Sequence, residues 1–109
     1  MTDADYNVAV GKSALGANVL GSRSTAIGTF ALQSQRPVDG SGNDEAVNSH
    51  NVAVGYQSGA SVTTGVQNVF VGALSGDATQ TGTSNTAIGH SALTSACTGD
   101  DNTALGRSA

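Results

Sequence analysis

The chain has 109 residues, enough for one domain, with a net charge of −4, 11% charged residues and 4% aromatic residues. Its four Lys and Arg residues are scattered, which argues against nucleic acid as a partner: Lys12, Arg23, Arg36 and Arg107. No apolar run approaches the roughly 20 residues that span a bilayer, so no membrane insertion is expected. The single cysteine, Cys97, excludes an intramolecular disulfide scaffold.

After a short lead-in over residues 1–6, we predict one repeat domain over residues 7–109. Repeats begin at residues 7, 24, 51, 68, 85 and 102, with units such as NVAVG, NVFVG and NTAIG. The step is 17 residues everywhere except between the second and third repeats, where it is 27. We number positions from the first residue of each repeat.

Two positions are nearly invariant within the chain and are predicted to carry the fold. Position 1 is Asn7, Asn51, Asn68, Asn85 and Asn102, with Ser24 as the exception. Position 5 is always glycine: Gly11, Gly28, Gly55, Gly72, Gly89 and Gly106. A second glycine recurs at position 15, as Gly21, Gly65, Gly82 and Gly99. Stacked Asn side chains predict an amide ladder, and position 15 is expected to need a left-handed backbone that Asn48 would tolerate in the second repeat.

Each repeat predicts short strands and no helix. Positions 2 to 4 are β-branched or small and favour a strand, and glycine at position 5 permits a corner. Positions 6 to 9 are expected to form a second short strand that ends in Leu or Gly. Positions 10 to 17 are rich in Ser, Thr and Gly and form the return. The expected fold is all-β: a parallel β-roll or β-solenoid with 17-residue rungs, in which equivalent strands stack about 4.8 Å apart.

A rung of this size encloses little apolar volume, so burial between chains is expected to supplement the core. We expect the aliphatic side chains at position 4 to fill the interior and the small residues at position 3 to face outward. Positions 3 and 9 are then the predicted contacts between chains. The longer second repeat places an insertion at about residues 35–50, which must lie in a turn because an extra residue within a strand would reverse its faces.

The sequence offers little chemistry. The adjacent carboxylates Asp100 and Asp101 could serve a glycan hydrolase, but Asp is common in turns and we favour that reading. The run DGSGNDE at 39–45 resembles a calcium loop but lacks the glycine after its third ligand, which favours a solvated loop. No Cys/His cluster predicts zinc, and neither a cofactor nor a catalytic residue is expected.

The units NVAVGKSAL (7–15) and NTAIGHSAL (85–93) resemble the head repeats of YadA-type trimeric adhesins and the NTAIG arrays of bacteriophage tail fibres. The likeness covers residues 7–109 and implies a homotrimeric, left-handed parallel β-roll used in attachment. The chain departs from the adhesin heads in its longer period and in the insertion at 35–50.

The sequence therefore predicts a structural or adhesive segment of a trimeric attachment fibre that contacts a host-surface glycan or protein. The candidate binding residues are Phe30, Arg36, Asp39, Asn43, Asp44, His50, Tyr56 and His90. The expected location is a virion tail fibre or a cell surface; the polar, acidic start MTDADYN is unlike a secretory signal and favours the phage. The alternatives are a fragment of a glycan-degrading tailspike and a self-assembling filament subunit.

Overall fold

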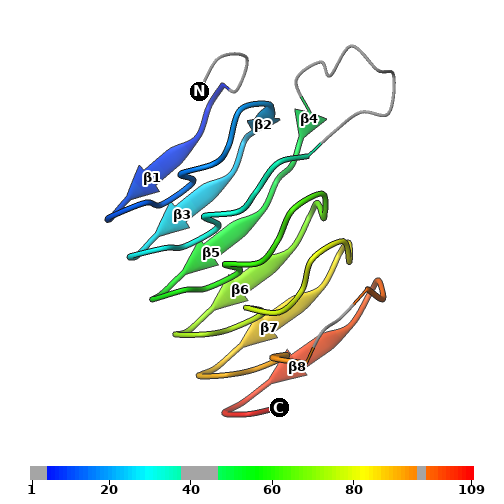
Figure 1. The fold of residues 1–109 in the computed structure, drawn as a ribbon. Coiled ribbons are helices and arrows are strands. Elements are labelled where there is room, and N and C mark those ends of the chain that lie inside the picture. The colour runs from blue at the N-terminus through cyan, green and yellow to red at the C-terminus, as the bar shows by residue number, and fades with distance from the viewer. Residues whose placement is uncertain (1–4, 38–46, 96–97) are drawn as a thin grey trace.

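A computed structural model of the chain describes residues 5–37, 47–95 and 98–109 (Figure 1). These residues contain strands and turns and no helix. Six short strands form one parallel sheet in the order β1 (Val8–Val10), β3 (Thr25–Ile27), β5 (Val52–Val54), β6 (Val69–Val71), β7 (Thr86–Ile88) and β8 (Thr103–Leu105). A second parallel pair joins β2 (Gly21–Ser22) and β4 (Val47–Asn48). The protein is thus an all-β solenoid of about five turns, as expected. The prediction of a second strand at positions 6 to 9 was wrong, because these residues form turns after the position-5 glycine.

Equivalent repeat positions lie beside one another throughout the large sheet. Val8 pairs with Thr25, and Val52 with Val69. Around the long second repeat, Gly21 pairs with Val47 and Ser22 with Asn48. Position 15 of that repeat is therefore Val47, and the expectation that Asn48 occupies it was wrong.

One extra residue follows this pair as a bulge. Ser22 and Thr25 are three residues apart, whereas their partners Asn48 and Val52 are four apart. The backbone N–H groups of Ser49 and His50 both point to the Ser22 carbonyl, at 3.0 and 3.5 Å. Such a bulge absorbs a residue without reversing the faces of the next strand. The lengthening of the second repeat is therefore shared between this bulge and the segment before Val47.

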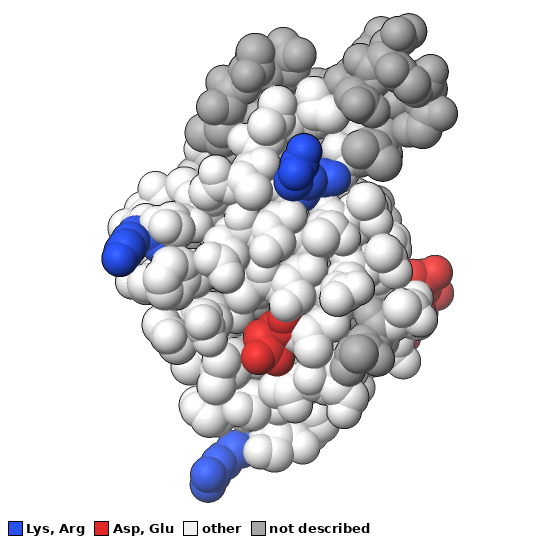
Figure 2. All heavy atoms as spheres, viewed as in Figure 1, with Lys and Arg blue, Asp and Glu red and all other residues white. Residues whose placement is uncertain are grey.

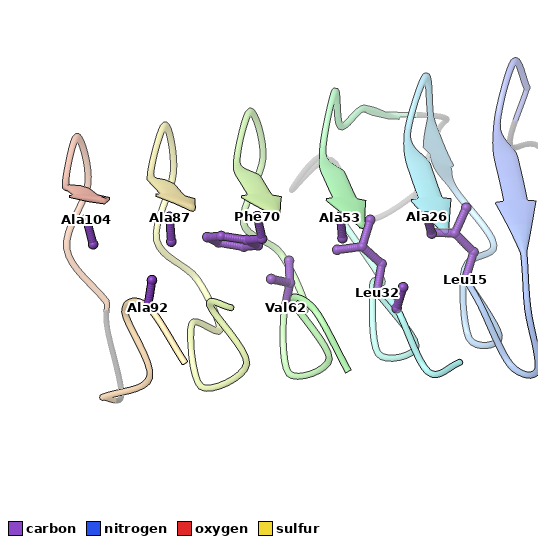
Figure 3. Close-up of a cluster of buried hydrophobic side chains, with 10 residues drawn as sticks. Leu15, Ala26, Leu32, Ala53, Val62, Phe70, Ala87, Ala92 and Ala104 are labelled. Carbon is purple, nitrogen blue, oxygen red and sulfur yellow. The ribbon is translucent and has the colours of Figure 1, made fainter. Parts of the chain in front are cut away.

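The interior is lined by position 3, contrary to the expectation that position 4 would fill it. Ala26, Ala53, Phe70 and Ala87 are fully buried, whereas the position-4 residue Ile27 is 39% exposed. Figure 3 shows the alanines pointing from the strands toward the return segments. The molecule is only 17 Å across its smallest dimension, so a layer of alanines leaves room for the larger position-9 side chains opposite. Leu15 and Leu32 are also buried and Leu93 is partly buried, so the position-3 and position-9 side chains of these rungs pack inside the solenoid.

The Phe70 ring fills the interior space that a position-9 leucine fills in other rungs, in the two rungs where position 9 is glycine. Position 9 is Leu15, Leu32 and Leu93 in three repeats and Gly59 and Gly76 in the other two described ones. A Cβ added to Gly59 would lie 2.9 Å from the Phe70 ring, and one added to Gly76 would also overlap it. The ring lies in the interior with Val62 beside it (Figure 3). One large side chain from the strand therefore substitutes for two from the return segment.

The Asn column joins consecutive rungs through the backbone. Asn68 Nδ2 donates to the Gly82 carbonyl at 2.9 Å, while Asn68 Oδ1 accepts from the Asn85 backbone N–H at 2.9 Å. Asn51 repeats this arrangement with Gly65 and Asn68. The predicted amide-to-amide ladder was therefore wrong for these Asn side chains; such a bond occurs between Asn102 and Asn85 at 3.0 Å.

The two glycine columns serve different purposes. Gly72 at position 5 has φ +126, a region that side chains strain to adopt. At position 15, Gly65 is absent from the residues with positive φ, so the predicted need for a left-handed backbone was wrong. A Cβ on Gly65 would instead collide with the Gly82 carbonyl of the next rung. Close packing between rungs, and not φ, requires this glycine.

Candidate functional site

One face of the six-stranded sheet is open to solvent, and we call it the outer face. Because position 3 points inward, positions 2 and 4 point outward. The outer face consists of Val8, Val10, Thr25, Ile27, Val52, Val54, Val69, Val71, Thr86, Ile88, Thr103 and Leu105. None of these side chains is charged, and all but Leu105 are β-branched.

The outer face forms one continuous strip along the solenoid. Six strands at about 4.8 Å spacing and three residues in length give a surface of roughly 25 by 10 Å. Val10 is 56% exposed and Leu105 74% exposed. A strip of about 250 Å² is no larger than a monomer commonly exposes, so its continuity and lack of charge, and not its area, distinguish it. Its side-chain polar groups are the hydroxyls of Thr25, Thr86 and Thr103, and no charged group lies on it. What it can do chemically is exclude water against another largely apolar surface.

A second surface, the aromatic ridge, follows the corner at positions 6 and 7 and consists of Lys12, Phe30 and Tyr56. The Phe30 and Tyr56 rings meet edge to face, with centroids 6.2 Å apart. Lys12 Nζ lies 5.9 Å from the centroid of the Phe30 ring. Tyr56 is half exposed, so its ring offers a flat apolar surface beside a hydroxyl and a cation. Such a combination suits a sugar or an apolar side chain.

The structure brings only some of the predicted binding residues together. Phe30 and Tyr56 are in contact, and His90 lies in the same column as Tyr56, with its Nδ1 3.0 Å from Ser91 Oγ. His50 is exposed at position 17, next to the other end of the strands, and Arg36 is exposed on the return segment. The predicted residues Asp39, Asn43 and Asp44 lie outside the described residues.

A buried polar network was missed by the sequence interpretation. Gln35 is fully buried: its Nε2 donates to Asn18 Oδ1 at 3.0 Å, and its Oε1 accepts from Asn51 Nδ2 at 2.8 Å. Ser24 Oγ also donates to Gln35 Oε1 at 3.2 Å. These bonds surround the one position 1 that lacks Asn. The sequence did contain a signal for this network. The repeat that has Ser24 in place of Asn at position 1 also has a polar residue, Gln35, at position 12, as the first repeat has Asn18.

The carboxylates that the structure describes form no cluster that could hold a metal ion. Asp100 Oδ1 accepts the Thr83 backbone N–H at 2.7 Å, a bond to the preceding rung and not within its own turn. Burial raises the pKa of Asp77 above its usual 3.8, opposed by hydrogen bonds from the backbone of Asp77 and Ala78. Within the described ranges, no three His, Cys, Asp or Glu residues lie close enough to hold a metal ion.

Comparison of the chain with models of known protein families, with curated proteins and with solved structures gives no match. In the part of the chain that the structure describes, no helix has the length and apolar character to cross a bilayer. The outer face and the aromatic ridge are therefore the features from which a function can be inferred.

Proposed function

We propose that this chain is a structural and adhesive segment of an attachment fibre, a phage tail fibre or a bacterial surface adhesin, in which three copies associate. The observation that carries the proposal is the uncharged, β-branched outer face, which runs through all six rungs of the sheet. A repeating solenoid supplies length and stiffness, and an apolar strip along it supplies a surface on which copies can associate. The left-handed coil and the trimer come from the resemblance to adhesin and tail-fibre repeats.

The aromatic ridge is the proposed contact with a host-surface glycan. Aromatic rings pack against the apolar faces of sugars, and the Tyr56 hydroxyl and Lys12 ammonium can hydrogen-bond to sugar hydroxyls. The ridge lies beyond position 5, beside the outer face and not on it. Association through the outer face therefore leaves this corner available to a ligand. The proposal includes no catalytic step, because Asp100 is engaged with the backbone of the preceding rung.

A glycan array tests the proposed adhesion. The purified chain should bind at least one class of host-surface glycan, and Tyr56→Ala should reduce that binding at least tenfold. Tyr6→Ala is the matched control, because Tyr6 is also exposed but lies next to Arg23 near the opposite border of the sheet. No binding by the unmodified chain, or equal loss in both variants, would contradict the assigned ridge. Turnover of a bound glycan would favour the tailspike alternative.

A further inference from the structure

The corner that carries the aromatic ridge is basic, although the chain as a whole has a net charge of −4. Positions 6 to 9 of the repeats all lie within the described residues, and they include Lys12 and Arg107 but no Asp or Glu. In Figure 2, Lys and Arg atoms lie at two levels on the side toward which the strands of Figure 1 point, and the acidic atoms in view lie away from that side. A local excess of positive charge attracts anionic ligands to this corner.

The described carboxylates all lie elsewhere, on the opposite border of the sheet or on the return segment: Asp5, Asp77, Asp100 and Asp101. The opposite border also has a cation over an aromatic ring, because the Arg23 guanidinium carbon lies 5.0 Å from the centroid of the Tyr6 ring. There, however, Arg23 Nε donates to Asn48 Oδ1 at 3.1 Å, and three carboxylates share the border. The ridge differs from that border in combining aromatic rings with positive charge that no neighbouring carboxylate offsets.

Lys12 holds its charge beside the rings of the ridge. Its Nζ lies 5.9 Å from the centroid of the Phe30 ring, and the Phe30 and Tyr56 centroids are 6.2 Å apart. Lys12 is exposed, and its ammonium has three N–H donors and no acceptor. A ligand that packs on these rings therefore brings its substituents within reach of a cation.

We infer that the ligand of the aromatic ridge is an acidic glycan, a saccharide chain that carries carboxylate or sulfate groups. A sugar ring packs on Phe30 and Tyr56, while its anionic group accepts hydrogen bonds from the Lys12 ammonium. Such charge-assisted bonds are roughly twice as strong as bonds between neutral groups. The inference rests on the proposed adhesion through the ridge and adds the chemical class of its ligand.

The second cation of the corner indicates that the ligand is a chain and not a single sugar. Lys12 follows β1 at the first rung, and Arg107 follows β8 at the sixth. Five steps of about 4.8 Å place these residues roughly 24 Å apart. One step is close to the length of one sugar unit in an extended polysaccharide. A hexasaccharide along the corner therefore reaches both cations, whereas a disaccharide on the rings reaches Lys12 alone.

Two pairs of matched polymers test the ligand class. Polygalacturonate and its methyl ester differ in carboxylate charge, and dextran sulfate and dextran differ in sulfate. We expect the unmodified chain to bind at least one acidic polymer roughly tenfold more tightly than its neutral match, from two exposed cations that contribute up to about fivefold each. The preference should disappear at high salt, because salt screens exposed charges. The pair that shows the preference identifies the recognised group as carboxylate or sulfate.

Three variants locate the preference on the molecule. Lys12→Met and Arg107→Met remove a charge and keep an apolar stem. With oligosaccharides of the preferred acidic class, Lys12→Met should weaken binding of the dimer and the hexamer roughly two- to fivefold, and Arg107→Met should weaken only the hexamer. Arg23→Met is the matched control, because Arg23 also lies over an aromatic ring but on the opposite border, and it should retain the full preference. Circular dichroism checks that each variant is folded.

Equal binding of the acidic and neutral polymers, lost in Tyr56→Ala, would overturn the inference and leave the proposed adhesion intact. The inference also fails if the preference survives in the double variant Lys12→Met with Arg107→Met, or if Arg23→Met removes it. Binding to no glycan of either class would overturn both the inference and the proposed adhesion.

Discussion

Replacing Phe70 with alanine tests the packing of the interior. The Phe70 ring is fully buried and lies against the two rungs where Gly59 and Gly76 replace leucine. Burial of a phenylalanine side chain, together with the cavity that its loss leaves, is worth about 3–5 kcal/mol. We expect the upper half of that range, because two adjacent glycines offer no side chain that could move into the space. Urea denaturation at fixed protein concentration measures the loss.

A second substitution distinguishes this packing argument from general damage. Leu15, with φ +53, and Leu32, with φ +48, show that position 9 accepts leucine in the conformation of Gly76, at φ +60. Gly76→Leu alone should destabilise by about 1–3 kcal/mol through overlap with the ring. Added to Phe70→Ala, it should recover at least about 2 kcal/mol by filling the cavity. If the double variant lost as much unfolding free energy as the two single variants together, the claim that Phe70 fills the space of two position-9 leucines would be refuted.

Three further predictions concern single positions. Asn68→Ala should cost about 3 kcal/mol in urea denaturation, because it leaves a buried N–H and a buried carbonyl unpaired. Gly72→Ala should lower stability by about 2 kcal/mol or more, since its φ of +126 strains any side chain, and recovery of full stability would contradict this reading. Burial raises the pKa of Asp77 above 3.8, so the folded chain holds that proton to higher pH than the unfolded chain, and stability should fall as pH rises from about 3.8 through the folded pKa. Asp77→Asn should flatten that fall, and an unchanged pH profile would contradict it.

The periodicity of the sequence was sufficient to predict the architecture. The six position-5 glycines and the β-branched segments before them predicted short parallel strands of equivalent residues, and the structure has them. The local pattern did not decide which face of each strand points inward. In a three-residue strand, one residue faces one way and two the other, so both assignments agree with the alternation. Which face points inward depends on how much room the interior has. That room depends on the size of the side chains that the return segment places opposite the strand.

The other errors have the same origin in contacts between rungs. Glycine at position 15 was read as a conformational requirement, but Gly65 is needed because the Gly82 carbonyl lies where a side chain would be. The Asn column was read as a stack of amides, but Asn68 bonds to the backbone on either side. Gln35 gave no periodic signal, because its role exists only where Ser24 interrupts the column. Of the binding candidates that the structure describes, only Phe30 and Tyr56 have rings in contact.

The central claim is that the outer face associates with copies of the same chain. Sedimentation equilibrium of the unmodified chain, compared with Val71→Lys at the middle of that face, tests it most directly. The Val71 side chain points out of the solenoid, and no residue of the outer face is charged. A lysine at this position can therefore extend into solvent, and the variant should remain folded by circular dichroism. We predict three times the mass of one chain for the unmodified protein and one chain for Val71→Lys. A single-chain mass for both, up to the highest soluble concentration, would contradict the account.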